Sequence, residues 1–444
     1  MNIFQLGTII FFMAVAVLAL LIFSGIIPTP GSEGNQTPND KLVVWGTLPL
    51  AQMKTAFSEI ENQAISKIKV TYVKKDKETL ELELLRASDN DASPDIVLFP
   101  ADSLLQIDDM LLPLPETSVN ERYIKDTFIE GGDIFITPVG VIALPLLVDP
   151  LMMYWNRDLF NKERLTDPPK TWDDVRSLTQ VLTKTDGRGQ ILQSAVAIGE
   201  SRNVNHLKDI VSLFFLQAGD GIILRNKETH EPYVFLGGAG INNEEQTPAV
   251  SALSFYTGFA NVRASNYSWS GSFSSSLESF IEGSVAMYFA PASDYSVIVN
   301  KNPHLNFDVA AIPQLKNTND VNFGRIYALG LSKKGKNKAN AIAFSKALTS
   351  TNDGATNIFV KTFSLPPARR SLLKDGTSDA TLSVFYKEAL ISKEWLDPKS
   401  EKSDSIFMRM VSDTLSESIK PDGAISFASA QLSLLLREIQ GKKP

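Results

Sequence analysis

The stretch ALPLLVDPLMMYWNRDLF, residues 143–160, places a carboxylate and two large aromatic side chains at the end of a segment that is otherwise apolar. Pro145 and Pro150 interrupt the apolar run, and Asp149 lies between apolar neighbours. A Tyr-Trp pair follows at 154–155. One interpretation is packing around a kink in the chain. The other is that the chain crosses here between two lobes and that the crossing lines a binding site.

Before this stretch, the sequence alternates between strand and helix patterns. Short apolar or alternating runs predict strands, and helical spacing of apolar residues predicts the helices between them. The strands are expected at 41–46, 67–75 and 94–100, and the helices at 49–64 and 77–88. This order predicts an α/β fold with a parallel sheet. Ligands of such sheets bind beyond the carboxyl ends of the strands, where Trp45 and the segment from Phe99 to Asp102 are expected.

Two later segments carry start and stop signals for helices. In DPPKTWDDV, residues 167–175, Thr171 is placed to cap a helix whose first turn contains two aspartates. Residues 274–295 predict a helix that ends at Gly283, followed by a strand and a polar loop.

The N-terminal residues are unusual in charge, because residues 1–32 contain no charged side chain. After a short segment at 1–8, residues 9–27 form an uninterrupted apolar run, and about 20 such residues span a bilayer core of roughly 30 Å. Residues 28–40 are rich in Pro, Gly and polar residues and predict a flexible tether. The alternative is a cleaved signal peptide. We favour an uncleaved single-span anchor, because no Lys or Arg precedes the apolar run and no clear cleavage motif follows it.

Composition narrows the range of functions. At 444 residues, the chain can bury a large core and form two or more lobes. A net charge of −7 argues against a nucleic-acid partner, whose binding calls for a basic surface. The absence of cysteine excludes disulfides, thiolate chemistry and cysteine-ligated zinc, and three histidines supply little for metal or triad chemistry. We therefore expect no cofactor, no metal and no catalytic residue.

Five segments, in order over about residues 41–370, resemble a known family. They are KLVVWG (41–46), PDIVLFPAD (94–102), the opening stretch followed by PPKTWDDV (168–175), FIEGSVAMYFAP (280–291) and GRIYALGLSKKGKNKANAIAFSKAL (324–348). With these segments, the chain resembles the extracellular solute-binding proteins of ABC transporters, specifically the maltose-binding-like carbohydrate-binding group. No single motif is specific, and the ordered set carries the resemblance.

The resemblance implies an α/β, two-lobed periplasmic-binding-protein fold of type II, with three crossovers between the lobes and a ligand in the cleft. The crossovers are expected near Asp149, at Arg325 to Ala328 and at Leu365 to Arg370. The N-terminal lobe would comprise 41–148 with 328–366, and the C-terminal lobe 149–327 with 367–440. Such proteins close on their ligand by a hinge motion.

By its place in the matching motifs, Asp149 is expected to hydrogen-bond sugar hydroxyls. Phe99 and Asp102 match an aromatic and a carboxylate after the third strand, and Tyr295 matches a loop that often bears a stacking aromatic. Sugars suit such sites, because their C–H faces stack on aromatic rings and their hydroxyls need hydrogen-bond partners. The full set of expected ligand-binding residues is Trp45, Thr47, Phe99, Asp102, Asp149, Trp155, Trp269, Tyr295, Arg325 and Tyr327.

Some of these residues also have a structural interpretation. A tryptophan at a strand end, such as Trp45, is typical of a core as well as of a ligand site. Trp155 matches a family aromatic that is mostly structural, and Trp269 lies in a Tyr/Trp/Ser-rich segment that is equally typical of a surface loop. Residues 200–250 match no family motif, and the Asn and His side chains at 203–206 would suit a smaller or more polar ligand.

The expected function is that of a membrane-tethered binding protein located outside the cell or in the periplasm. It would act as a monomer, capture a carbohydrate and deliver it to the permease subunits of an ABC transporter. The apolar helix at 9–27 would replace the lipidated cysteine that bacterial relatives often use and that this chain lacks. Two alternatives stay open: a glycan-acting enzyme, which needs a carboxylate pair at a defined separation, and a ligand sensor or adhesin on the same fold.

Overall fold

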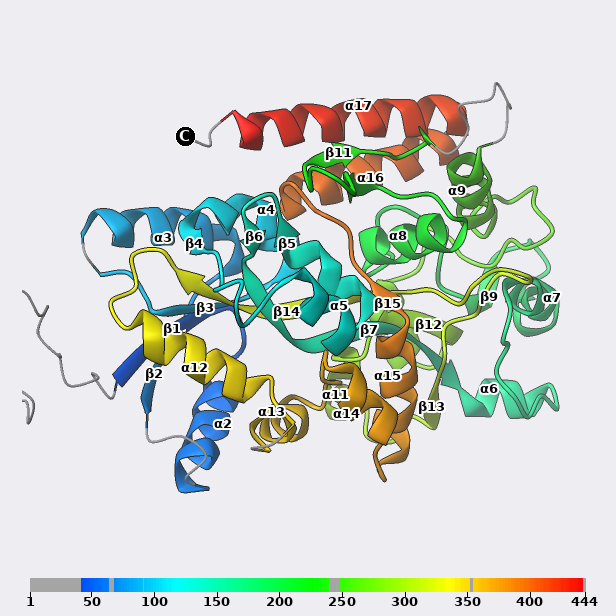
Figure 1. Cartoon of the computed structure of the whole chain (residues 1–444). Helices are drawn as coiled ribbons and strands as arrows, with labels where there is room; N and C mark the ends of the chain where they lie inside the picture. Colours follow the sequence, from blue (N-terminus) through cyan, green and yellow to red (C-terminus); the bar gives the residue numbers. More distant parts are fainter. Residues whose placement is uncertain (1–40, 64–67, 91, 239–246, 352–353, 442–444) are drawn as a thin grey trace, which may run out of the picture. The chain divides into compact units, whose positions relative to one another are not determined.

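The computed structural model describes residues 41–63, 68–90, 92–238, 247–351 and 354–441 (Figure 1). Contacts group Leu42–Pro444 into one compact unit. The predicted segment 1–8, apolar anchor 9–27 and tether 28–40 lie outside the described residues. Among the helices that the structure does describe, none has both the length and the apolar character that crossing a membrane requires.

From β1 to β3 strands and helices alternate, as the sequence predicts, and later parts of the chain also contain consecutive helices. The strands are β1 (Lys41–Gly46), β2 (Lys69–Lys74), β3 (Ile96–Pro100), β4 (Leu111–Leu112), β5 (Ile136–Thr137), β6 (Gly140–Val141), β7 (Ala143–Asn156), β8 (Lys184–Thr185), β9 (Ile191–Val196), β10 (Ile223–Arg225), β11 (Pro232–Val234), β12 (Val285–Pro291), β13 (Phe307–Ala310), β14 (Asn322–Ser332) and β15 (Ser392–Lys393). The helices are α2 (Leu50–Asn62), α3 (Leu80–Asp89), α4 (Leu104–Ile107), α5 (Glu121–Thr127), α6 (Arg157–Lys162), α7 (Trp172–Leu182), α8 (Leu207–Gln217), α9 (Pro248–Gly258), α10 (Ser276–Ile281), α11 (Asp294–Lys301), α12 (Lys338–Leu348), α13 (Ala355–Phe363), α14 (Arg370–Asp375), α15 (Ala380–Leu390), α16 (Ser400–Leu415) and α17 (Pro421–Gln440). Short 3-10 turns are η1 (Lys77–Thr79), η2 (Ala101–Ser103), η3 (Asp108–Met110) and η4 (Glu130–Phe135).

Two long strands, β7 and β14, run antiparallel in the middle of the main sheet. The strand order is β2-β1-β3-β14-β7-β12-β9-β8, with β4 and β15 also paired to β14 and β13 paired to β7. β1 and β3 pair in parallel, as predicted for an α/β fold. Because β7 pairs with β14 along its first half and with β12 and β13 along its second, this strand carries the sheet from one set of neighbours to the other.

The strand β7 stays continuous although it contains two prolines. Its register with β14 shifts between two residues: Tyr327 lies opposite Leu147, and Ala328 lies opposite Pro145. Leu146 is therefore the extra residue of a β-bulge. A bulge accommodates proline, which has no N–H for the hydrogen-bond ladder. The kink that the sequence indicates is thus a local irregularity within one buried strand.

A third segment of chain crosses beside this bulge, on β7. The Val148 N–H donates to the Pro366 carbonyl (2.9 Å), and the Ala368 N–H donates to the Leu146 carbonyl (2.9 Å). The segment 366–368 thus pairs with β7 near the place where β7 pairs with β14. The three crossings that the family resemblance implies therefore lie side by side.

The predicted helix signals are confirmed. The Asp174 N–H donates to Thr171 Oγ1 (3.3 Å), and the Thr171 N–H donates to Asp174 Oδ2 (3.0 Å), which makes a capping box at the start of α7. Gly283 follows α10 with φ +80°, a left-handed conformation that glycine adopts without strain, and β12 begins at Val285.

A buried carboxyl joins α15 to the central strands. Asn322 Nδ2 donates to Glu388 Oε2 (2.8 Å) and to the Leu151 carbonyl (2.8 Å), which connects α15, β14 and β7. Burial raises the pKa of Glu388 to about 8. The carboxyl is therefore mostly protonated at neutral pH, and its oxygen Oε2 accepts the hydrogen bond that joins α15 to β14.

We expect Glu388→Gln to remove a pH dependence of stability. The unfolded chain releases the Glu388 proton near the ordinary pKa of 4.5, whereas the folded protein holds it up to about pH 8. The wild-type free energy of unfolding should therefore fall between these two pH values, and the stability of the variant relative to the wild type should rise over the same window. Urea unfolding of both proteins at about pH 5 and about pH 9 checks this. An equal difference at the two pH values would contradict it.

Candidate ligand-binding site

Arg325 lies in a cluster of buried charges formed where strands end and a helix begins. Its strand, β14, pairs with β3, and Asp102 follows β3 in the turn η2. Arg325 Nη2 donates to Asp209 Oδ2 in the first turn of α8 (3.1 Å), and Arg325 Nε lies 3.7 Å from Asp102 Oδ2. The guanidinium therefore connects the start of α8 to the end of β3.

Lys77 and Ser400 complete the surroundings of Asp102, which is only 5% exposed. Lys77 Nζ donates to Asp102 Oδ2 (2.8 Å) and to Ser400 Oγ (3.0 Å), and Ser400 Oγ lies 3.3 Å from the same carboxylate oxygen. Burial alone would raise the pKa of Asp102, but the positive charges of Arg325, Lys77 and Lys208 outweigh it and hold this pKa below its usual value. Asp102 is therefore ionised at neutral pH.

Lys208 is buried among partners from the C-terminal part of the chain. Its Nζ donates to Asp397 Oδ2 (2.7 Å) and Ser400 Oγ (2.9 Å) and lies 2.9 Å from Asp404 Oδ1. Burial alone would lower the pKa of Lys208, but the carboxylates raise it above its ordinary value. A buried ammonium without such partners would cost several kcal/mol. These contacts therefore fix the start of α16 against the start of α8.

Three polar atoms of this cluster are buried and have no hydrogen-bond partner in the described part of the chain: Asp102 Oδ1, Arg325 Nε and Glu394 Oε1. The other oxygen of Glu394 accepts the Ile326 N–H (2.7 Å). Thr47 Oγ1, which directly follows β1, is also buried without a partner. Buried polar atoms in proteins are normally hydrogen-bonded. A guanidinium donor grouped with two carboxyls matches a ligand with hydroxyl groups, because a hydroxyl both donates and accepts.

A cavity of about 340 Å³ lies beside the cluster. Lys77, Arg202, His206, Lys208 and Arg325 are among the residues that line it. This volume lies at the lower end of the range for small-molecule pockets. Its lining is mainly polar and charged, which indicates a polar ligand.

His206 brings a further polar group to this cavity. It occupies the N-cap position of α8 with φ +56°, and its Nε2 lies 3.2 Å from Asp294 Oδ2. The Tyr288 hydroxyl donates to the same oxygen (2.7 Å). Burial would lower the pKa of His206, but Asp294 outweighs it and raises this pKa above its ordinary value.

Asp149 is buried in β7, which is separated by β14 from β3, the strand that Asp102 follows. It lies opposite Arg325 in the β7–β14 register, and its Oδ1 accepts the Ser293 N–H (2.9 Å). Burial raises the pKa of Asp149, although the hydrogen bonds from Ser293 and the charge of Arg325 oppose the shift. The carboxylate thus holds the loop after β12 against β7. Its contact with a ligand stays a prediction.

Trp155 and Trp269, two of the predicted ligand contacts, pack in the core. Trp269 is fully buried, stacks on Phe273 (ring centroids 4.6 Å apart) and donates from Nε1 to Asn203 Oδ1 (2.9 Å). Trp155 packs against Phe160, with the ring centroids 5.0 Å apart. These rings lie among apolar neighbours, so a ligand contact for either stays a prediction.

The other predicted aromatics have varied surroundings. Phe99 is fully buried, and Tyr295 packs against other aromatic rings. Lys75 Nζ lies 3.9 Å from the centroid of the Trp45 ring. Tyr327 lies opposite the last residue of β3, two residues from the guanidinium of the cluster. Of the predicted set, the structure brings Asp102 and Arg325 into direct contact.

Sequence reasoning missed the cations and the C-terminal residues of the cluster. Lys77 lies at the start of the helix predicted at 77–88, and Lys208 lies in the stretch 200–250 that matches no family motif. Neither position indicated burial. Asp397 did carry a signal, because it stands between Leu396 and a proline, the same pattern that singled out Asp149. A search for every aspartate between an apolar residue and a proline would have found it.

A mixed α/β fold with three crossings beside buried polar groups defines a two-lobed periplasmic-binding-protein fold, as predicted. The family model described as bacterial extracellular solute-binding protein matches residues 50–354, more than half of the 444-residue chain. The protein therefore belongs to this family. The comparison with curated proteins gave no match.

Solved structures of sugar-binding proteins share the fold. A cyclo/maltodextrin-binding protein complexed with maltotetraose is 18% identical, with a TM-score of 0.72 over 93% of this chain and 100% of that chain. The GacH receptor of Streptomyces glaucescens GLA.O, studied unliganded and with acarbose, is 15% identical, with a TM-score of 0.67 over 90% and 98%. An ABC transporter solute-binding protein from Thermotoga lettingae TMO, bound with α-D-tagatose, is 19% identical, with a TM-score of 0.61 over 89% and 99%.

We expect Lys208→Ala to destabilise the unliganded protein by about 3–5 kcal/mol, because it leaves the buried Asp397 without its ion-pair partner. Arg263→Ala is the matched control. It removes an ion pair with Glu417 in which both side chains are more than two-thirds exposed, so its effect should be about 0–1 kcal/mol. Urea unfolding of the three proteins measures both changes. Similar losses for the two variants would show that the Lys208 cluster is not a buried network.

Proposed function

We propose that the protein captures a carbohydrate in the cleft beside Asp102 and Arg325 and delivers it to the permease of an ABC transporter. The observation that carries the proposal is the group of buried polar atoms without hydrogen-bond partners on Asp102, Arg325 and Glu394. Sugar hydroxyls can satisfy donors and acceptors together. The bound maltotetraose, acarbose and tagatose of proteins with the same fold support this ligand class.

In this proposal the cleft lies between two lobes, and each lobe is formed by two separate parts of the sequence. One lobe comprises 41–148 with 328–366, and the other comprises 149–327 with 367–440. The pairing of β7 with β14 and with the segment 366–368 supports this division, because each proposed boundary falls in or beside one of these three crossings. Closure of the lobes would bring Asp102 and Asp209, which share Arg325, around the ligand.

Binding can be tested by thermal shift with maltotetraose, acarbose and α-D-tagatose, on protein that begins near Asn39. A ligand at 100-fold above its Kd should add about 2.7 kcal/mol to the free energy of unfolding. Analysis of each sugar after incubation separates binding from enzymatic turnover. Hydrolysis of a sugar would favour a glycan-acting enzyme and contradict the proposal. Adjacent permease genes would support transport over a sensor or adhesin.

We expect Asp102→Asn to weaken the sugar that binds by roughly ten- to a hundredfold, because a hydrogen bond to a charged group contributes about 1.5–3 kcal/mol. Calorimetric titration measures the affinity, and a melting curve without ligand reports the fold. Asp89→Asn, an exposed aspartate at the end of α3, is the control and should leave affinity unchanged. Full affinity in a folded Asp102→Asn protein would remove this carboxylate from the site.

Membrane attachment is a separate part of the proposal. Residues 9–27 would remain on the mature protein as a single-pass anchor, with 28–40 as a tether to the binding domain outside the cell or in the periplasm. The uninterrupted apolar run and the lack of cysteine support this. We expect the protein in the membrane fraction with an intact mass that includes residues 9–27. Soluble protein whose N-terminus lies at about residue 28 to 35 would instead indicate a cleaved signal peptide.

A further inference from the structure

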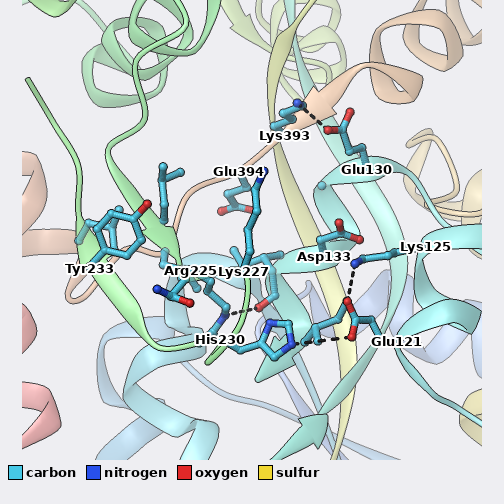
Figure 2. A pocket seen from close by; sticks show the side chains of 17 residues that line it. Glu121, Lys125, Glu130, Asp133, Arg225, Lys227, His230, Tyr233, Lys393 and Glu394 are labelled. Carbon is cyan, nitrogen blue, oxygen red and sulfur yellow. Dashed lines mark hydrogen bonds and ion pairs between the residues drawn. The ribbon is translucent and has the colours of Figure 1, made fainter. Parts of the chain in front are cut away.

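Figure 2 shows a second cavity, which has a volume of about 580 Å³. Its walls come from three segments: 121–136, which contains α5 and η4, the hairpin of β10 and β11, and residues 393–396. It shares no lining residue with the cavity of about 340 Å³ beside Arg325, although Glu394 of the Arg325 cluster also lines it. Its volume falls within the range of small-molecule pockets.

The hairpin is held firmly against the first wall. Arg225 Nε donates to the Ile134 carbonyl (3.3 Å), and Arg225 Nη1 donates to the His230 carbonyl (2.9 Å) within the hairpin. His230 Nε2 also lies 3.7 Å from Glu121 Oε2. These contacts position the two walls relative to each other without a ligand.

The two walls carry opposite charge. The α5–η4 wall lines the cavity with Glu121, Glu130 and Asp133 against one cation, Lys125. The basic side chains that the hairpin contributes are Arg225, Lys227 and His230, and no acidic side chain of the hairpin is among the lining residues. Figure 2 shows Glu121, Glu130 and Asp133 toward the right and Tyr233, Arg225 and Lys227 toward the left.

The remaining charges divide into paired and unpaired groups. Glu121 pairs with Lys125, and Glu130 pairs with Lys393 (2.8 Å). By contrast, the buried atoms Asp133 Oδ1 and Arg225 Nη2 have no hydrogen-bond partner among the described residues. Lys227 extends from the exposed turn of the hairpin into the same lining. Carboxyl acceptors and basic donors thus face one cavity from its different walls.

Asp133 can interact with a cation in this cavity. Burial raises the pKa of Asp133. An ammonium group next to this carboxyl would favour its ionised form. The apolar residues of the lining, which include Ile134, Ile223 and Leu396, can contact the carbon atoms of a small ligand.

We propose that this cavity binds a small zwitterion of the amino-acid or betaine type. The ammonium group lies toward Asp133, and the carboxylate lies toward Arg225 and Lys227. A ligand with a single charge would satisfy one wall and leave the other unpartnered, so a zwitterion binds more tightly than either of its halves. None of these three residues belongs to the sugar site.

Calorimetric titration with L-alanine, glycine betaine and diglycine tests the proposal, with acetate and methylammonium as single-charge comparisons. At least one zwitterion should bind saturably at millimolar concentration and more tightly than both single ions. Lys227→Glu and Asp133→Asn should each weaken that binding by about tenfold or more. Lys361→Glu, at an exposed lysine of α13, is the charge-matched control and should leave it unchanged.

Two further results separate this site from the sugar cleft. The affinity of Asp102→Asn for the zwitterion should equal that of the wild type. The affinity of Lys227→Glu for the sugar should also equal that of the wild type. Lys227 is exposed, so its substitution should leave the protein folded. Absence of saturable binding for all three zwitterions would overturn the proposal. Binding that survives both Lys227→Glu and Asp133→Asn, or equal binding of acetate or methylammonium, would also overturn it.

Discussion

The ion pairs of Arg325 with Asp102 and Asp209 connect parts of the chain that are far apart in sequence. A guanidinium cannot lose its proton inside a protein, so it must keep charged or polar partners wherever it is buried. Asp209 lies in the first turn of α8, and Asp102 directly follows β3. The charge of Arg325 therefore sets where α8 begins relative to the end of β3, and Lys77 and Lys208 extend this constraint to α16 through Ser400.

Such a network contributes more to a defined geometry than to stability. Taking charges out of water costs several kcal/mol for each ion, and the attraction between partners in the interior offsets this cost without exceeding it by much. Removing one partner is expensive, because the other charge stays buried. The cluster therefore tolerates few alternative arrangements of η1, η2 and the starts of α8 and α16. A binding site gains from this, since fixed donors and acceptors do not have to be ordered when the ligand arrives.

The sequence predicted the order of strands and helices over residues 41–100, Thr171 as a helix N-cap and the glycine that follows α10, because all of these depend on neighbouring residues. It also predicted that Asp102 and Arg325 belong to one site. It could not predict Lys208 or Ser400, since their partners are distant in the chain: Lys208 meets Asp397 across 189 positions, and Ser400 meets Asp102 across 298. The aromatic residues were the least predictable. A pattern shows that Trp269 is large and apolar, and only tertiary packing decides that its ring stacks on Phe273.

Two aspartates, Asp149 and Asp397, precede a proline and follow an apolar residue, and both are buried. Proline has no N–H, so the residue that follows each aspartate offers no local donor for its carboxylate. Both side chains accept hydrogen bonds from distant residues: Asp149 from the Ser293 N–H, and Asp397 from Lys208 Nζ. Asp397 also accepts from two nearby residues, the Lys399 N–H and the Ser403 hydroxyl. Because a buried carboxylate without donors is costly, each such position draws a distant segment toward itself. The buried aspartate before a proline thus fixes a distant segment by a hydrogen bond. Asp149 fixes the loop after β12, and Asp397 fixes the start of α8.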